Sequence, residues 1–293
     1  MFSLAPLLYR NVFADEGGPI ARTQSSEVQI FDQPSYQVGA FLRQELVSGK
    51  KNHVMYGAAD GTGSAQNPAV AKHLAISEAL EHWAYHETHN SPGRAKYGFL
   101  VDRSSNGMSA FPGFAWQARR RARFEALKRY ALIGWWDRQL DAKIQCAPYP
   151  DVGLIRIQHG QNFGEVVVLF HRAPTGFVAY GHAAGSTLAS ATSRAVIELV
   201  RCEMVISRYR SMGGLADSSD YFEKRCLHFS TPEGFAEFSE RTRADTNKPA
   251  PKWKTAFDGE IQGPWSQWAT VWRHCVEMPC GDFLDQNKNF FFW

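Results

Sequence analysis

The sequence has few cysteines and no long apolar run. Its five cysteines are scattered among 293 residues and form no C-x-x-C pair, which argues against a disulfide framework or a structural zinc site and favours a reducing, cytoplasmic environment. No apolar run reaches the length of about 20 residues that a membrane span needs. The apolar N-terminal segment lacks the basic region and cleavage site of a signal peptide, so we expect none.

The sequence also has little net charge. Thirty-two basic and 29 acidic residues leave a net charge of +3, which is too small to suggest nucleic-acid binding. The arginine-rich segment 119–123 spreads its charges around a helix, which favours a solvated face over a nucleic-acid patch. Hydrophobic residues make up 44% of the chain and charged residues 21%, as in an ordinary globular protein.

Aromatic residues are abundant by contrast. Nine Trp and 20 Phe predict a thick aromatic core or an aromatic surface that takes a peptide or a partner protein. The sequence ends in Asn289–Trp293. Because so apolar a tail is sticky when it is free, we expect it to dock on its own protein or on a partner.

The order of the predicted elements indicates an α+β fold, in which antiparallel sheets are backed by helices and sheet-plus-helix units are internally duplicated. Asn67 and Pro68 provide the N-cap and the first position of a helix that ends near His86 or His89. Three strands joined by turns predict an antiparallel meander. The meander strands are 152–157, 165–170 and 176–180; the other predicted strands are 28–31, 53–56 and 97–101; the other predicted helices are 37–47, 114–140 and 188–209; and loops are expected at 57–64, 104–113 and 181–186.

Glutamates recur inside three of the predicted helices. The sequence SEALEH aligns without gaps with FEALKR, 47 positions later, so that Glu78 matches Glu125. A weaker third copy, Arg194–Val205, is centred on Glu198. Each helix therefore places a glutamate inside an otherwise apolar segment, and this pattern needs a physical explanation.

Cations offer one explanation. Glu78 and Glu81 lie three positions apart and face the same way on a helix, among apolar neighbours. Carboxylates gathered in such surroundings repel one another unless cations neutralise them, and magnesium typically brings nucleotide phosphates with it. Lys128, Arg129 and Arg201 could contact the phosphate oxygens. Each glutamate is also explained as a surface residue or as one half of a salt bridge, and the spacing alone leaves that alternative open.

Several motifs, taken in order, resemble the YcaO-type domain. The chain has GS before a helix with SEALEH, then SNGMSA before a helix with FEALKR, then a meander and IELVR, over roughly residues 55 to 210. The resemblance implies ATP and magnesium bound by glutamates on three helices, and phosphorylation of a backbone amide oxygen in a peptide. It further implies a ribosomally made precursor peptide as substrate, with azolines, thioamides or amidines as products, and a leader-binding or TfuA/E1-like partner protein. We also expect a homodimer.

Carried over residue by residue, the resemblance assigns roles to side chains on the three helices and near them. The expected metal ligands are Glu78, Glu81, Glu125 and Glu198. The expected cofactor-binding residues are Ser64, Ser109, Gln117, Lys128, Arg129 and Arg201. The ATP-binding core is expected at 51–212, with an N-terminal segment at 1–50 packing on it and an aromatic-rich C-terminal part of the same domain at 213–293.

The chain departs from the family pattern at three positions. Family members carry a phosphate-binding lysine between glycines before the first helix, whereas here Ser64 follows Gly63. The second acid of the second pair is Lys128, and the arginine after the first pair is His82. Two hypotheses follow. Either Lys128 replaces a magnesium ion by a fixed ammonium group in an active enzyme, or the protein is a degenerate, non-catalytic subunit that binds a peptide or a partner enzyme.

A third alternative rests on histidines. His82, His86 and His89 share one face of the first glutamate helix, and histidines four positions apart can hold zinc. No HExxH motif accompanies them. An unrelated metal-dependent hydrolase is therefore the weakest of the three interpretations.

Overall fold

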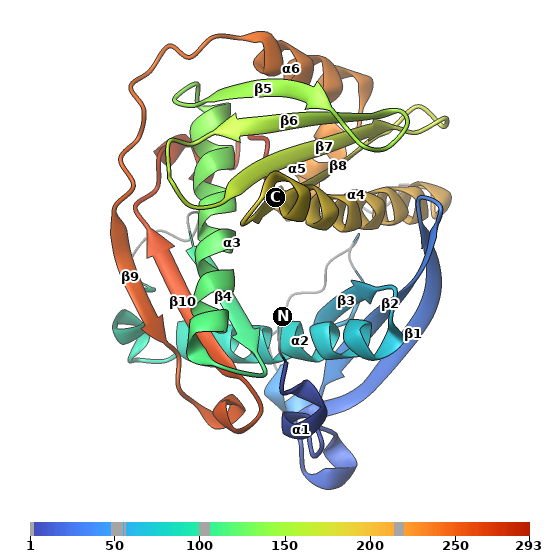
Figure 1. The fold of residues 1–293 in the computed structure, drawn as a ribbon, viewed down its shortest axis with the longest axis vertical. Coiled ribbons are helices and arrows are strands. Elements are labelled where there is room, and N and C mark those ends of the chain that lie inside the picture. The colour runs from blue at the N-terminus through green and yellow to red at the C-terminus, as the bar shows by residue number, and fades with distance from the viewer. Residues whose placement is uncertain (1–2, 48–54, 56, 100–105, 214–219) are drawn as a thin grey trace. The chain divides into compact units, whose positions relative to one another are not determined.

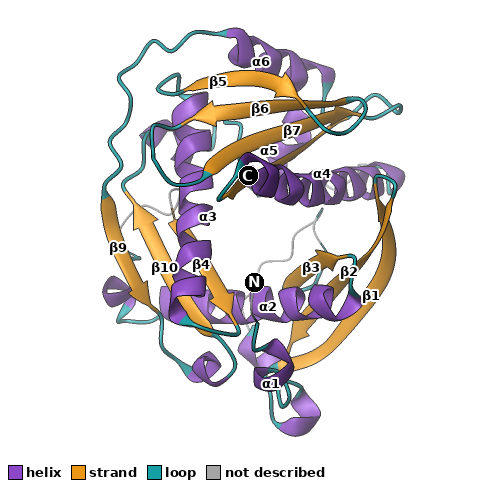
Figure 2. Cartoon of the chain, in the orientation of Figure 1, coloured by secondary structure: helices purple, strands orange, loops and turns teal. Residues whose placement is uncertain are grey.

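The computed structural model describes residues 3–47, 55, 57–99, 106–213 and 220–293, which fall into two compact units. The first unit combines Met1–Asn52, Ala58–Ala126 and Thr255–Val276, and the second combines His53–Gly57, Leu127–Lys254 and Glu277–Trp293. Both units contain antiparallel sheets and helices, which confirms the predicted α+β class (Figure 2).

Two three-stranded antiparallel sheets form the first unit. One has the strand order β1–β2–β3, with β1 at Ile20–Ile30, β2 at Gln33–Leu42 and β3 at Gly61–Ala65. The other has the order β4–β10–β9, with β4 at Asn106–Phe111, β9 at Thr255–Glu260 and β10 at Thr270–Val276. Short helical segments complete the unit: α1 at Ala5–Leu8, η1 at Ala14–Glu16, η2 at Gln44–Leu46, η3 at Arg94–Tyr97 and η4 at Pro264–Gln267.

Helix α2, Pro68–His89, packs against β3 and β2 of the first sheet (Figure 1). The side-chain oxygen of Asn67 accepts hydrogen bonds from the backbone N–H of Ala69 at 2.9 Å and of Val70 at 3.3 Å. This cap and the proline that follows it confirm the predicted start of the helix. On the buried side of α2, the Trp83 ring lies 5.5 Å from the ring of Trp265, edge to face.

A four-stranded antiparallel sheet is the centre of the second unit, with the strand order β5–β6–β7–β8. The strands are β5 at Asp141–Cys146, β6 at Val152–Gln158, β7 at Glu165–Arg172 and β8 at Val178–Gly185. Helix α4, Leu188–Ser211, lies across β8 and β7 (Figure 1). The strands β6, β7 and β8 confirm the predicted meander.

Three more helices and a 3₁₀ turn contribute to the second unit. Helix α3, Ala115–Trp136, belongs to the second unit from Leu127 onward. Helices α5, Tyr221–Phe229, and α6, Pro232–Arg243, pack on each other, and η5 spans Gly281–Leu284. Thr231 caps α6 by accepting a hydrogen bond from the Gly234 N–H at 3.1 Å.

The aromatic C-terminal segment is buried in the second unit. Phe290, Phe291 and Phe292 are 4%, 0% and 3% exposed. The Phe291 ring lies 4.8 Å from that of Phe238 and 5.0 Å from that of Tyr180. The segment therefore docks on its own chain, which confirms one of the two outcomes expected from its composition.

Several glycine-rich and small-residue segments differ from the prediction. The loops expected around Gly61, Asn106 and Gly181 are strands β3, β4 and β8, because these residues pair with neighbouring strands and pack against helices. The helix predicted at 37–47 is wrong: most of it is β2, in which Val38, Ala40 and Leu42 are buried in alternation, the period of a strand.

Other differences are smaller. Strand β5 was not predicted. The strand expected at 97–101 is not formed at Tyr97–Phe99, because η3 ends at Tyr97 and Gly98 has a left-handed φ of 72°; the rest of it lies outside the described residues. The strand expected at 53–56 also lies outside them, apart from Met55. Within the described ranges, every helix is too short or too polar to cross a membrane.

Candidate functional site

Three strand–helix repeats share one packing feature. In β3–α2, β4–α3 and β8–α4, a glycine of the strand lies against the backbone of the following helix. A Cβ atom added at Gly61, Gly107 or Gly181 would lie within 3.0 Å of a helix carbonyl oxygen and of the amide nitrogen four residues further on. The helix can approach this closely only where the strand has no side chain. The carbonyl and amide groups concerned belong to Ala75 and Ala79 for Gly61, to Ala122 and Ala126 for Gly107, and to Ala195 and Leu199 for Gly181.

The glutamates occupy equivalent positions in these repeats. Glu78, Glu125 and Glu198 each come directly before the helix residue whose amide faces the strand glycine. The gap-free alignment of Glu78 with Glu125 therefore matches their positions in the fold, and the weaker third copy at Glu198 matches as well. The predicted internal duplication is thus present in the structure as a repeated strand–helix contact.

Glu78 has neutral hydrogen-bond donors. Its Oε2 accepts a hydrogen bond from the Thr62 backbone N–H at 2.9 Å and another from the Thr62 hydroxyl at 3.2 Å. The Glu78 side chain is half-buried on α2. Thr62 is not among the residues predicted for the site. Its local signal, a threonine between Gly61 and Gly63, was interpreted as part of a flexible loop.

Glu198 has a different environment. Its Oε1 lies 3.2 Å from Nη1 of Arg201, one turn later on α4, and 48% of its side chain is exposed. An exposed ion pair of this kind contributes only about 0–1 kcal/mol, so it holds the carboxylate weakly. The salt-bridge alternative considered for the glutamates therefore describes Glu198 better than Glu78.

The remaining predicted site residues are distributed over both units. Glu81 and Glu125 are half-buried in the first unit, and Lys128 and Arg129 are half-buried on the part of α3 that belongs to the second. The Arg129 guanidinium lies 5.6 Å from the centre of the Phe292 ring, a cation–π distance. The site roles of these four residues stay predictions.

Three predicted nucleotide contacts are buried within the first unit. Ser64 is 5% exposed on β3 and Ser109 is 7% exposed on β4. Gln117 is 1% exposed, and its Oε1 accepts a hydrogen bond from the Phe114 N–H at 3.1 Å, at the start of α3. Ser64 thus lies in a strand and not in the flexible loop that was expected around it.

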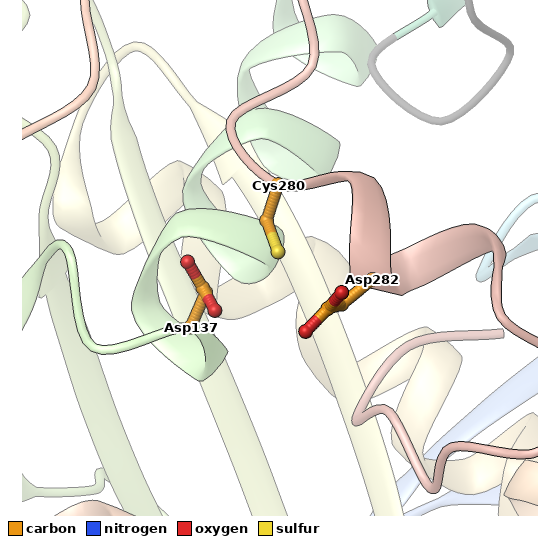
Figure 3. Close-up of side chains that lie close together, drawn as sticks. All are labelled: Asp137, Cys280 and Asp282. Atoms are coloured by element: carbon orange, nitrogen blue, oxygen red, sulfur yellow. The ribbon is translucent and has the colours of Figure 1, made fainter.

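The described residues bring three metal-ligand side chains within 4.8 Å of one another in one place, and this place includes none of the predicted ligands. The three are Asp137, Cys280 and Asp282 in the second unit (Figure 3). Lys248 Nζ lies 2.6 Å from an Asp137 oxygen, and Lys288 Nζ lies 2.7 Å from an Asp282 oxygen. The two carboxylates are therefore already neutralised by ammonium groups.

The pKa shifts of Asp137 and Cys280 also fit an ion-pair network. Burial acts to raise the pKa of Asp137, but hydrogen bonds from Lys248, Gln139 and Cys280 outweigh it, so the pKa lies below its ordinary value. Burial, together with the neighbouring carboxylates, raises the pKa of the Cys280 thiol above its ordinary value. A protonated thiol is a poor metal ligand, so the cluster is better explained as an ion-pair network that ties η5 to the end of α3.

No family model matches this sequence, and no curated protein matches it. Its structure is similar to a chain of the E. coli microcin synthetase McbBCD complex with pro-MccB17 bound, with a TM-score of 0.56 and 12% identity over 88% of this chain and 87% of that chain. A chain of the E. coli microcin synthetase McbBCD complex in a second structure gives a TM-score of 0.56 and 11% identity over the same shares. The TM-score of 0.56 indicates a shared fold, and at identities this low the similarity shows the fold alone.

Proposed function

We propose that this protein modifies a ribosomally made peptide, by ATP- and magnesium-dependent activation of a backbone amide. Two independent lines support the proposal. The ordered motifs of the sequence resemble the YcaO-type domain. The fold is similar to that of a chain from a microcin synthetase complex, one structure of which has pro-MccB17 bound.

The repeated position of the three glutamates is the observation that carries this proposal. A fold that needed only helix formers at these places would not require the same acidic residue beside each strand glycine. Glu78 fits a magnesium ligand well, because the Thr62 donors hold one of its oxygens and add no positive charge. Magnesium is commonly bound by one or two carboxylates together with substrate phosphates and water, so a closed cage of protein ligands is not needed.

Acidic and basic side chains would have different roles in the site. The proposed magnesium ligands are Glu78, Glu81 and Glu125 in the first unit and Glu198 in the second. The proposed contacts to nucleotide phosphates are Lys128, Arg129 and Arg201. When bound, ATP supplies a phosphoryl group that converts an amide oxygen into a better leaving group. The chain itself would orient the nucleotide and offset the charge that develops on the transferred group.

Nucleotide titration by calorimetry, with and without magnesium, tests the proposal. We expect magnesium-dependent ATP binding by the unaltered protein. The Glu78→Gln variant should bind at least about tenfold more weakly, since even an outer partner of a metal ligand is worth that much. Glu87→Gln is the matched control, because Glu87 is exposed on the same helix and should leave binding unchanged. Absence of binding by the unaltered protein at millimolar ATP would overturn the catalytic proposal.

A non-catalytic, peptide-binding subunit is the second candidate. The pairing of Glu198 with Arg201 and the place of Ser64 inside a strand favour a degenerate nucleotide site. Strand β1 is an edge strand of its sheet, and an extended peptide can add to such an edge. A stable complex with a precursor peptide, formed without nucleotide hydrolysis, would favour this candidate.

A further inference from the structure

We infer that Thr62 is a positioning residue for the Glu78 carboxylate, and that its hydroxyl sets the magnesium dependence of nucleotide binding. This inference rests on the proposed function and deepens it. Thr62 lies between Gly61 and Gly63 on β3, and its N–H and its hydroxyl both contact the carboxylate of Glu78.

The backbone of Thr62 is fixed by its neighbours. Strand β3 pairs with β2, and Thr62 lies opposite Gly39 in that pairing. Gly61 and Gly63 lie against the backbone of α2, where a Cβ atom on either would come within 3.0 Å of it. The Thr62 N–H is therefore held at a constant position relative to the turn of α2 that carries Glu78.

Both donors of Thr62 converge on one carboxylate oxygen. The N–H and the hydroxyl reach Oε2 of Glu78 at 2.9 and 3.2 Å. A threonine hydroxyl has one proton to donate, so this bond commits it to Glu78. No described residue donates a hydrogen bond to Oε1, which leaves that oxygen available to a cation.

The hydroxyl donor is particular to the first repeat. The residue after the strand glycine is Met108 in the second repeat and His182 in the third, and neither has a hydroxyl. Glu198 is instead paired with the guanidinium of Arg201. Only neutral donors contact Glu78 among the described residues, so its position is fixed without cancelling the charge that would attract a cation.

Fixing a ligand before the cation arrives raises affinity. A free glutamate side chain loses rotamer freedom when it binds, and an anchored one has lost it already. Outer-shell partners of metal ligands typically change metal affinity by about 10–100-fold when they are removed. The Thr62 hydroxyl has the geometry of such a partner.

Substitutions at Thr62 separate its hydroxyl from its backbone. Thr62→Val keeps the shape and the N–H of the residue but removes the hydroxyl, and Thr62→Ser restores a hydroxyl. We expect Thr62→Val to weaken magnesium-dependent ATP binding about tenfold in calorimetry and to raise the magnesium concentration at half-saturation. Thr62→Ser should bind close to the unaltered protein. ATP binding measured without magnesium should be the same in all three, a result that a merely structural role would not produce.

The outcomes distinguish this inference from the function on which it rests. If Glu78→Gln weakens binding and Thr62→Val does not, Thr62 is no positioning residue, although the nucleotide site stands. Failure of Thr62→Ser to restore binding also overturns the inference. If the unaltered protein binds no ATP, both fall. Should Thr62→Val melt at a lower temperature, Thr62→Ala is compared with Thr62→Ser in its place, and the same magnesium dependence decides.

Discussion

The contact between β8 and α4 makes a specific prediction about Gly181. An alanine at this position places a methyl group closer than 3.0 Å to Ala195 O, Leu199 N and Leu199 Cα, whereas ordinary contacts begin at 3.4 Å. These atoms are helix backbone and cannot rotate away, so α4 must move off the sheet. Overpacking of this kind costs about 1–3 kcal/mol, and rigid neighbours place it near the upper end. The lower chain entropy of alanine in the unfolded state offsets about 0.5–1 kcal/mol.

The net loss for Gly181→Ala is therefore about 2 kcal/mol. In a unit of this size the loss corresponds to a fall in melting temperature of roughly 4–8 °C. Urea unfolding followed by tryptophan fluorescence and thermal melting followed by circular dichroism both measure it, and their agreement tests whether the unfolding transition is two-state.

Gly281→Ala is the matched control within the same unit. A Cβ atom at Gly281 meets nothing within 4 Å, and its φ is not left-handed. Its free energy of unfolding should stay within about 0.5 kcal/mol of that of the unaltered protein. If Gly181→Ala were equally neutral, the close strand–helix contact that places Glu198 would be wrong.

Two further predictions concern the second unit. The pKa of Asp137 lies below its ordinary value, so its ion pair with Lys248 stabilises the fold above the unfolded-state pKa and loses this effect as the pH falls through the folded-state pKa. Asp137→Asn should therefore be less stable than the unaltered protein in urea at pH 7, with the gap closing below about pH 4; a gap that widens in acid would contradict this. Phe291→Ala removes a fully buried ring and should cost about 3–5 kcal/mol in the same assay, whereas an unchanged urea midpoint would show that the aromatic segment is not docked.

Long helices with local start signals were predictable from the sequence. Asn67 and Pro68 mark the beginning of α2 by themselves, and the observed helix begins at Pro68. The meander was predictable because its strands carry apolar runs separated by turn residues. Strands β3 and β4 were not, since their sequences, GTGSA and NGMSAF, have the composition of loops. They become strands through pairing and helix packing, which no local pattern encodes.

Part of the candidate site was predictable from the sequence, and part was not. The equivalence of Glu78 and Glu125 was visible as a 47-residue repeat, because duplication leaves a trace in the sequence. The contact of Thr62 with Glu78 was not visible, because it depends on how β3 and α2 pack together. The ion-pair network of Asp137, Cys280 and Asp282 joins residues more than 140 positions apart, a distance over which a single sequence gives no signal.

The strand glycines carry a consequence for finding distant relatives of this chain. The glutamate follows the glycine by seventeen positions at Gly61 and Gly181 and by eighteen at Gly107. The glycine of each pair is required by the close contact between strand and helix, and the glutamate is the proposed magnesium ligand. A search keyed to this interval in three copies should detect chains with this strand–helix packing even at an overall identity as low as 12%.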